Sequence, residues 1–363
     1  MKKRILSVIL VAIFCIGLVS DAVYADVQTE YVVTGVDGVS KSSDRSDYSS
    51  DEVFANFRTL TAGNISPYNM FRSCSPYHDY HGRSKYASKL MEQNGIVDVI
   101  NFWDNEDDFY DNISKKKYSY YFSLHESGTV HLLDTDIIMG DASFKSAIAS
   151  GMKVLADNEG PYLVHCRAGK DRTGFFCALL EAFMGASRQE ILDDYMLTYY
   201  NFFQYGDNII TQDDYDNIKS NTIDPIFREI TGYSDVSSLS DNVLYTSAVS
   251  YLKSIGLNDT DLANIRKHMT VYRLKAPVIK TLKKKSKTSL TVKWRKDSDA
   301  TGYQIRIKSK SSSKYYNVTS NKGKQVIKNL KSGTSYTVSV RAYNKTSSKT
   351  YYSEWGMAQK VKL

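Results

Sequence analysis

Cysteine and proline are scarce in this sequence, with 4 cysteines and 5 prolines among 363 residues, and no long apolar run follows residue 19. The run from Ile5 to Val19 follows the basic residues 2–4 and precedes a small-residue site ending at Ala25. This order is typical of a cleaved secretory signal peptide, because the run is too short to span a membrane. Cys15 lacks the small-residue context of a lipoprotein site. We therefore expect residues 1–25 to be a signal peptide and the mature chain to be secreted, extracellular and without a transmembrane span.

The cysteines left after cleavage are odd in number. Cys74, Cys166 and Cys177 remain, whereas exported proteins commonly use cysteines in pairs. Cys177 falls in an apolar helical pattern and is predicted to be a core residue. The count indicates a thiol kept for chemistry, and the role of Cys74, including a reversible disulfide, stays open.

Acidic residues are nearly absent from the end of the chain. From residue 276 onward there are 21 Lys and Arg against 3 Asp and Glu, whereas residues 26–275 hold 23 basic and 36 acidic residues. A shift of this size predicts a domain boundary at Lys275–Pro277. The expected parts are a signal peptide (1–25), a flexible leader rich in Ser and Asp (26–52), a main domain (53–273) and a second domain (276–363).

Apolar runs of strand type alternate with helical patterns in the main domain. Residues 94–103 and 162–166 are predicted to be buried strands, and residues 143–156 between them have apolar side chains at helical spacing. Further helices are predicted at 175–185, 188–203 and 259–269. This alternation predicts an α/β domain with a mainly parallel central sheet flanked by helices.

The second domain shows short alternating segments separated by Asp, Gly, Ser and Asn, as in 290–296, 302–310 and 336–344. They predict an all-β sandwich over residues 276–363. The absence of cysteine excludes a disulfide-bonded immunoglobulin domain. The stretch from WRKDSDATGYQIRIKS to YYSEW resembles a fibronectin type III domain, in which Trp294 and Tyr336 would be core residues.

One stretch of the main domain, GPYLVHCRAGKDRTG at residues 160–174, changes character halfway. An apolar strand pattern ends at Cys166, a small and charged turn follows, and a helical pattern begins after Arg172. A helix N-terminus presents unpaired N–H groups and a partial positive charge, and glycine lets the backbone wrap closely around an anion. The planar guanidinium of Arg172 can hold two phosphate oxygens at once. The pattern predicts an anion-binding turn.

The same electrostatic field acts on Cys166, because thiols at helix N-termini and beside cations ionise more readily. A thiolate would then lie beside the bound phosphate. A nucleophile and an oxyanion clamp in one turn predict phosphoryl transfer through a cysteinyl-phosphate, followed by attack of water.

The spacing of His165, Cys166, Arg172 and Thr173 is the signature of the cysteine-dependent protein tyrosine phosphatase superfamily. The fuller HCRAGKDRTG resembles its bacterial subgroup, which includes secreted tyrosine and phosphoinositide phosphatases. NFRTLTAG, MFRSCSP and VDVINFWDNEDD resemble the opening segments of that subgroup. The resemblance covers residues 54–269 and implies that the main domain (53–273) is catalytic.

The resemblance also implies a role for each residue of the turn. Cys166 would be the nucleophile, Arg172 would bind the phosphate and stabilise the transition state, and Thr173 would orient the thiolate and help it leave. His165 would hydrogen-bond the backbone near the turn. The phosphate cradle would consist of the backbone amides of Arg167, Ala168, Gly169, Lys170, Asp171 and Arg172.

The general acid is not marked by the Trp-Pro-Asp sequence that many superfamily members use. Asp171, within the turn, is the first candidate by spacing and by resemblance. Asp134, Asp136 and Asp104 remain alternatives.

The expected substrate is a protein that carries phosphotyrosine, with a phosphoinositide or an inositol phosphate as the alternative. Lys170 bears on this choice, because it could meet a second phosphate or merely pair with a neighbouring acid. A non-catalytic phosphate-binding adhesin or scaffold is a further alternative. The mechanism needs no metal and no cofactor, and the pair His78 and His81 lacks supporting carboxylates for a metal site.

The lysines of the basic second domain are spread over short strands, and the sequence shows no clustered aromatic platform. This distribution argues against nucleic acid as a partner. An anionic cell-surface polymer is the expected partner, which would leave the protein associated with the cell surface, and a soluble spacer is the alternative.

Overall fold

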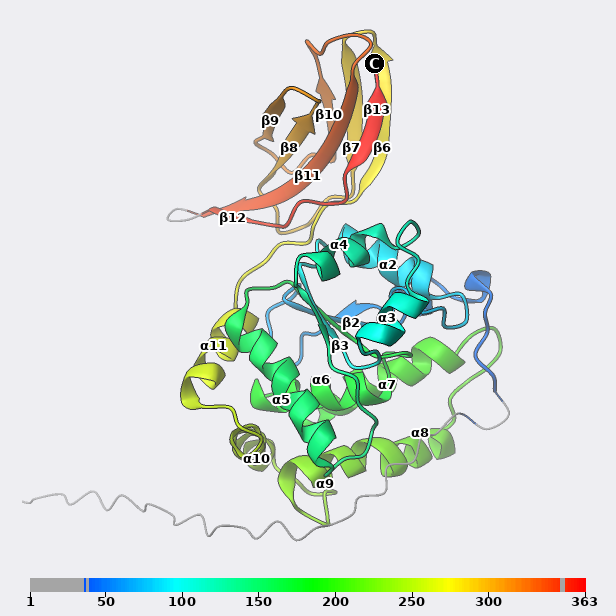
Figure 1. Cartoon of the computed structure of the whole chain (residues 1–363), viewed down its shortest axis with the longest axis vertical. Helices are drawn as coiled ribbons and strands as arrows, with labels where there is room; N and C mark the ends of the chain where they lie inside the picture. The colour runs from blue at the N-terminus through cyan, green and yellow to red at the C-terminus, as the bar shows by residue number, and fades with distance from the viewer. Residues whose placement is uncertain (1–35, 37–38, 347–349) are drawn as a thin grey trace, which may run out of the picture.

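The computed structural model describes residues 36, 39–346 and 350–363, so the expected signal peptide lies outside the described residues. Figure 1 shows two bodies. The larger one ends with α11 (Asp259–Met269), and the smaller one is a β-sandwich that begins with β6 (Ile279–Ser286). Within the described ranges, no helix is both long and apolar enough to cross a membrane.

The larger body is built around a five-stranded sheet with the strand order β1-β2-β5-β3-β4. The edge strand β1 (Arg58–Thr59) pairs antiparallel with β2 (Met70–Ser73), and the other pairings are parallel. The central strand β5 (Tyr162–His165) lies between β2 and β3 (Asp98–Asn101), and β4 (Val130–Leu132) forms the other edge. The sheet is mixed and mainly parallel, as predicted.

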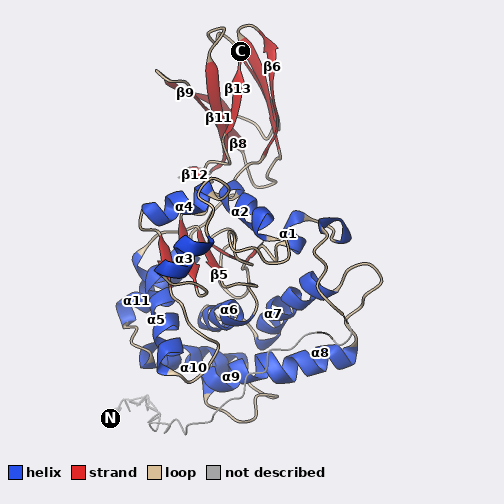
Figure 2. Cartoon of the chain, turned by 45° about the vertical axis from the view of Figure 1, so that its right-hand side comes forward, coloured by secondary structure: helices blue, strands red, loops and turns tan. Residues whose placement is uncertain are grey.

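Helices cover both faces of this sheet (Figure 2). Alternate strand residues face opposite sides: Val99 and Leu163 pack in one core with α2, α3 and α4, while Ile100 and Val164 pack in a larger core with α5, α6 and α7. Helices α8 to α11 also contribute side chains to the larger core. The bounds are η1 (Arg45–Asp47), α1 (Asp51–Phe54), α2 (Ser84–Gln93), α3 (Glu106–Asn112), α4 (Ser119–Glu126), α5 (Ala142–Asp157), α6 (Asp171–Phe183), α7 (Arg188–Phe203), α8 (Gln212–Ile218), η2 (Lys219–Ile223), α9 (Asp224–Thr231) and α10 (Asp241–Ser254).

The segment 39–52, part of the residues 26–52 that the sequence assigned to a flexible leader, packs against the larger body. Arg83 is fully buried and donates to the Ser42 carbonyl oxygen at 2.8 Å and to the Tyr48 hydroxyl at 2.8 Å. The Ser and Asp residues that indicated mobility act instead as helix caps. Asp44 caps η1 and Ser50 caps α1, since short polar side chains satisfy the first free N–H groups of a helix.

The β-sandwich consists of two antiparallel sheets, with strand orders β10-β7-β6 and β12-β11-β8-β9, and β13 also pairs with β11. Trp294 and Tyr336 are buried in the core between them, as predicted. The bounds of these strands are β7 (Ser289–Trp294), β8 (Gly302–Lys308), β9 (Ser313–Val318), β10 (Lys324–Ile327), β11 (Ser335–Lys345), β12 (Thr350–Tyr352) and β13 (Gln359–Lys362).

One face of the sandwich gathers aromatic and basic side chains that the sequence had shown as dispersed. The guanidinium groups of Arg306 and Arg341 lie 4.4 Å and 4.6 Å from the centre of the Trp355 ring, and Arg341 also lies 4.0 Å from the Tyr352 ring. Tyr315 joins the group at 6.0 Å from Trp355. The expectation that this domain lacks an aromatic cluster is therefore wrong, because strands far apart in sequence bring the rings together.

Candidate active site

The turn that the sequence singled out lies where β5 ends at His165 and α6 begins at Asp171. Gly169 has a φ of +65°, and a Cβ atom at this position would lie 2.0 Å from the Ser73 carbonyl oxygen. Only glycine fits this close approach to the end of β2. The turn thus lies at the carboxyl edge of parallel strands and at the N-terminus of a buried helix, which is a favourable place for an anion.

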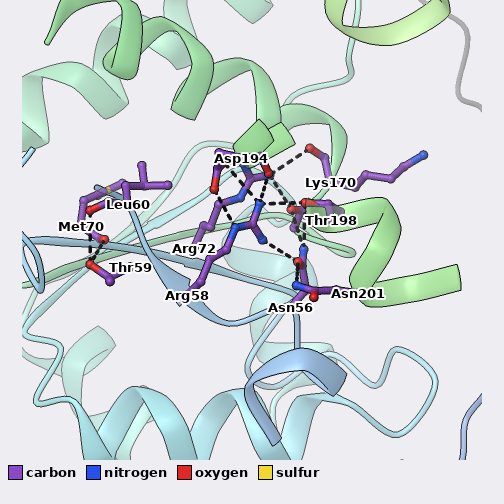
Figure 3. A network of polar contacts seen from close by, with 11 residues as sticks. Asn56, Arg58, Thr59, Leu60, Met70, Arg72, Lys170, Asp194, Thr198 and Asn201 are labelled. Atoms are coloured by element: carbon purple, nitrogen blue, oxygen red, sulfur yellow. Dashed lines mark hydrogen bonds and ion pairs between the residues drawn. The ribbon is translucent and has the colours of Figure 1, made fainter. Parts of the chain in front are cut away.

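A buried polar network holds a carbonyl oxygen of this turn (Figure 3). Arg72, on β2, donates to the Gly169 carbonyl oxygen at 3.0 Å and to the Asp194 carboxylate at 2.6 Å. Asn56 donates to the same Gly169 oxygen at 3.2 Å. The C=O and N–H of one trans peptide unit point in opposite directions. Fixing the Gly169 carbonyl on Arg72 therefore turns the N–H of Lys170 away from the network.

Asp194, on α7, anchors this network from the helix side. Its carboxylate accepts from Arg58 at 2.7 Å as well as from Arg72. Burial alone would raise the pKa of Asp194, but the two guanidinium groups outweigh it and hold that pKa below its usual value. The carboxylate is charged at neutral pH, and it links β1, β2 and α7 beneath the turn.

Cys166 is buried, and so are Thr173 and His165, the two side chains expected to support it. The hydroxyl oxygen of Thr173 is buried and has no hydrogen-bond partner among the described residues. A buried hydroxyl without a partner costs free energy, so it is available to a thiolate or a ligand. The ring of His165 contacts the Cys166 carbonyl oxygen through Nδ1 at 3.2 Å and the Tyr121 hydroxyl through Nε2 at 2.8 Å.

Burial lowers the pKa of His165 to about 3, so its imidazole is neutral at physiological pH. A neutral ring in this position holds the backbone of the turn through hydrogen bonds. Because the ring is neutral, it does not act as a general acid towards a leaving group at neutral pH.

Arg172 is held in place by backbone carbonyls from two other segments. Its Nη1 donates to the carbonyl oxygens of Phe102 at 2.9 Å and Thr135 at 2.8 Å. Its guanidinium carbon lies 4.6 Å from the centre of the Trp103 ring. Because a guanidinium carries five N–H donors, Nε and Nη2 remain for a bound anion.

The candidate acids lie in different surroundings. Asp171 is half-buried and forms an ion pair with the Lys170 ammonium at 3.3 Å. Asp134 and Asp136 are exposed, on either side of the residue whose carbonyl holds Arg172. Asp104 is buried, accepts hydrogen bonds from Tyr77 and Asn101, and burial raises its pKa. Asp104 follows Trp103, whose ring lies on Arg172, but its carboxyl oxygen is already bound by Tyr77 and Asn101. The geometry therefore leaves Asp171, Asp134 and Asp136 as the candidate acids that are not buried.

Lys170 is buried, and its contacts help to decide whether it meets a second phosphate or pairs with a neighbouring acid. Its ammonium pairs with Asp171 and donates to the Tyr199 hydroxyl at 3.3 Å. Burial lowers its pKa, but the Asp171 carboxylate and Tyr199 outweigh this effect and raise the pKa of Lys170 overall. This geometry favours the reading in which Lys170 pairs with a neighbouring acid.

Several residues at the site escaped the sequence analysis. Arg72, Asn56 and Asp194 hold the turn, and Lys41 lies against Tyr80 close to it. The segments NFR and FRS carried a resemblance to the phosphatases, which is a signal for the two arginines. No pattern in the sequence pointed to Lys41.

Cys74, Cys166 and Cys177 all have free thiols, and burial raises the pKa of Cys74 to about 12. His78 packs edge-on against a tryptophan ring, whereas His81 faces a serine hydroxyl. Across the part of the chain that the structure describes, no group of three or more His, Cys, Asp or Glu side chains could hold a metal ion.

Comparison with known proteins gives matches to both bodies. Residues 111–271 match the model of the tyrosine phosphatase family, and residues 276–355 match that of the fibronectin type III domain. The curated "Putative tyrosine-protein phosphatase" of Cupriavidus necator is 27% identical over 125 residues, which are 34% of this chain and 45% of that relative. The chain thus spans less than half the length of this relative.

Among solved structures, similarity extends over the sandwich. One titled "Myokine structure" has 22% identity and a TM-score of 0.21, and the match covers 24% of this chain and 94% of the other. The fibronectin type III domain of human collagen XX has 20% identity and a TM-score of 0.20, over 24% and 90% of the two chains. Residues 111–271 thus resemble the tyrosine phosphatase family, and a match to the fibronectin type III domain follows at residues 276–355.

Proposed function

We propose that the protein is a secreted phosphatase that hydrolyses phosphomonoesters through a cysteinyl-phosphate. The first proposed substrate is a protein that carries phosphotyrosine. The observation that carries this proposal is the turn between β5 and α6, which begins with Cys166 and leads to Arg172 in the first turn of α6. The family match of residues 111–271 supports phosphatase activity. Export rests on the expected signal peptide, and N-terminal sequencing of the mature protein should find a start after Ala25.

In the first step, the Cys166 thiolate attacks phosphorus, so that an S–P bond forms while the P–O bond to the leaving group breaks. The backbone amides of the turn and the free donors of Arg172 face the phosphoryl oxygens, on which charge builds up in the transition state. Because two carbonyls and the Trp103 ring already fix the guanidinium, little reorganisation is needed when the substrate binds.

The leaving oxygen takes a proton from a carboxylic acid, and Asp171 is the first candidate for this role. A water molecule then attacks the phosphocysteine, the S–P bond breaks, and inorganic phosphate leaves with the thiolate regenerated. Thr173 stabilises the sulfur as it leaves, a role supported by its buried hydroxyl, which has no hydrogen-bond partner among the described residues.

Hydrolysis of p-nitrophenyl phosphate by the wild type and by Cys166→Ser tests this proposal. The serine variant should lose turnover, while Arg172→Ala should lose both turnover and phosphate binding. Equal rates for the wild type and Cys166→Ser would leave only the alternative in which the turn binds phosphate without chemistry. For a substrate with a poor leaving group, Asp171→Asn should be slow, and a normal rate would move the acid to Asp134 or Asp136.

A further inference from the structure

Two cations beside the phosphate-binding turn surround one aromatic ring. The Lys41 ammonium donates to the Tyr80 hydroxyl and lies 5.2 Å from the centre of the Tyr80 ring. The guanidinium carbon of Arg167 lies 5.8 Å from the same ring and 5.4 Å from the Trp103 ring. Arg172 lies on that Trp103 ring as well. Arg172 and Arg167 thus share the Trp103 ring, and Arg167 and Lys41 share the Tyr80 ring.

Neither Lys41 nor Arg167 forms an ion pair with a carboxylate among the residues that the structure describes. The acid with the largest electrostatic effect on Lys41 is Asp171, whose carboxylate is already paired with Lys170. The region 26–275 holds 36 acidic and 23 basic residues. Two unpaired cations side by side are therefore not a consequence of a generally basic surface.

Lys41 is also half-buried, and desolvation followed by repulsion from Lys170 lowers the pKa of Lys41 to about 8. A charge that is withdrawn from water is normally paired, because its desolvation is otherwise uncompensated. The ammonium contacts the neutral Tyr80 hydroxyl and aromatic rings, and a bound anion would supply the compensating charge.

We propose that Lys41 and Arg167 form a second anion subsite, which binds a second phosphate carried by the same small substrate as the phosphate at Cys166. This inference rests on the proposed function and adds a substrate preference to it. Arg167 directly follows the nucleophile in the chain, so the second anion lies close to the reacting phosphate. Two phosphates on one ring fit this short separation better than an acidic residue several positions away in a peptide.

Phosphatase assays with matched substrates test the subsite. The substrates are p-nitrophenyl phosphate, a myo-inositol monophosphate, a myo-inositol bisphosphate with neighbouring phosphates, and a phosphotyrosyl peptide flanked by Asp and Glu. The variants are Lys41→Gln and Arg167→Gln, the second of which keeps the backbone amide of the turn. The control is Lys115→Gln, because Lys115 also lies against two aromatic rings but away from the turn.

We expect Lys41→Gln and Arg167→Gln each to lower kcat/KM for the bisphosphate by roughly tenfold or more, the usual effect of one charged hydrogen bond. The loss for the two monophosphates should be smaller, and Lys115→Gln should leave the ratio between substrates unchanged. Vesicles of phosphatidylcholine with a bisphosphorylated inositol lipid, compared with the free bisphosphate, distinguish a lipid headgroup from a soluble source.

Equal losses for monophosphates and bisphosphate would overturn the inference, because Lys41 would then only support the turn. A larger loss for the acidic peptide would also overturn it and assign the cations to a protein substrate. If the wild type hydrolyses nothing, the proposed function fails separately. The subsite is then tested by calorimetry, in which Cys166→Ser should bind the bisphosphate roughly tenfold more tightly than Cys166→Ser with Lys41→Gln.

Discussion

Arg72→Lys tests how far the buried network shapes the phosphate-binding turn. The guanidinium of Arg72 reaches the Gly169 carbonyl oxygen and the Asp194 carboxylate at once, whereas an ammonium is a single compact charge that does not reproduce this fork. Asp194 keeps Arg58 as a partner, so no buried charge is left alone. The loss is therefore that of a hydrogen bond to a charged group, about 1.5–3 kcal/mol of unfolding free energy. For a domain of this size, that loss lowers Tm by roughly 3–12 °C.

The effect on activity should be larger than the effect on stability. With Arg72 gone, the Gly169 carbonyl is held by Asn56 alone, and the peptide that follows it can rotate. A displacement of reacting groups by 1 Å can cost about 100-fold in rate. We expect kcat/KM for p-nitrophenyl phosphate to fall by about that factor, and the inhibition constant of vanadate to rise, at a temperature well below the Tm of the variant.

Arg188→Lys is the matched control, because Arg188 forms a partly buried pair with Asp224 at 3.3 Å away from the turn. It should lose stability but keep the affinity for vanadate. The reasoning would be refuted if Arg72→Lys lowered Tm while both kcat/KM and vanadate inhibition stayed at their wild-type values. The network would then stabilise the fold without orienting the turn.

Three further changes test separate parts of the molecule. Gly169→Ala should lower kcat/KM at least about 100-fold, because the new Cβ would collide with the backbone of β2, and activity within tenfold of wild type would show that the turn can adapt. Asp194→Asn should cost about 3–5 kcal/mol at neutral pH, because it leaves two buried arginines without their carboxylate. Since the pKa of Asp194 is lowered in the folded state, its stabilisation is present above the unfolded pKa of about 4 and is lost as the pH falls below it, so urea unfolding of the variant should depend less on acid pH. In the sandwich, Arg306→Gln with Arg341→Gln should weaken co-sedimentation of the full chain with a glycerol phosphate polymer more than the charge-matched control Lys283→Gln with Lys285→Gln does, and an equal loss would mean that only the total charge matters.

The strand-turn-helix arrangement around Cys166 could be predicted because its signals are local. The apolar strand, the glycine and the arginine all lie within one short stretch, and a mainly parallel sheet follows from the alternation of strands and helices. The contacts that fix the turn could not be predicted in this way. Arg72 and Asn56 lie 97 and 113 residues from Gly169, so only the folded chain brings them together.

Lys170 shows the same limit at closer range. Its partner Asp171 is the next residue, but Tyr199 lies 29 residues away on another helix. The sequence could therefore suggest that this lysine meets a second phosphate or pairs with a neighbouring acid, but it could not decide between the two. For residues 39–52, the composition favoured a flexible leader. In the structure, Ser and Asp residues of this segment serve as N-caps of helices.

The burial of Arg83 has a practical consequence for anyone who shortens the chain. A version starting at residue 53, the boundary suggested by composition, would strip away the Ser42 carbonyl and the Tyr48 hydroxyl. The guanidinium would then be left with the Phe54 carbonyl and the Phe54 and Phe202 rings as its neighbours. Affinity tags are therefore best joined upstream of residue 39, so that the larger body keeps the segment that covers Arg83.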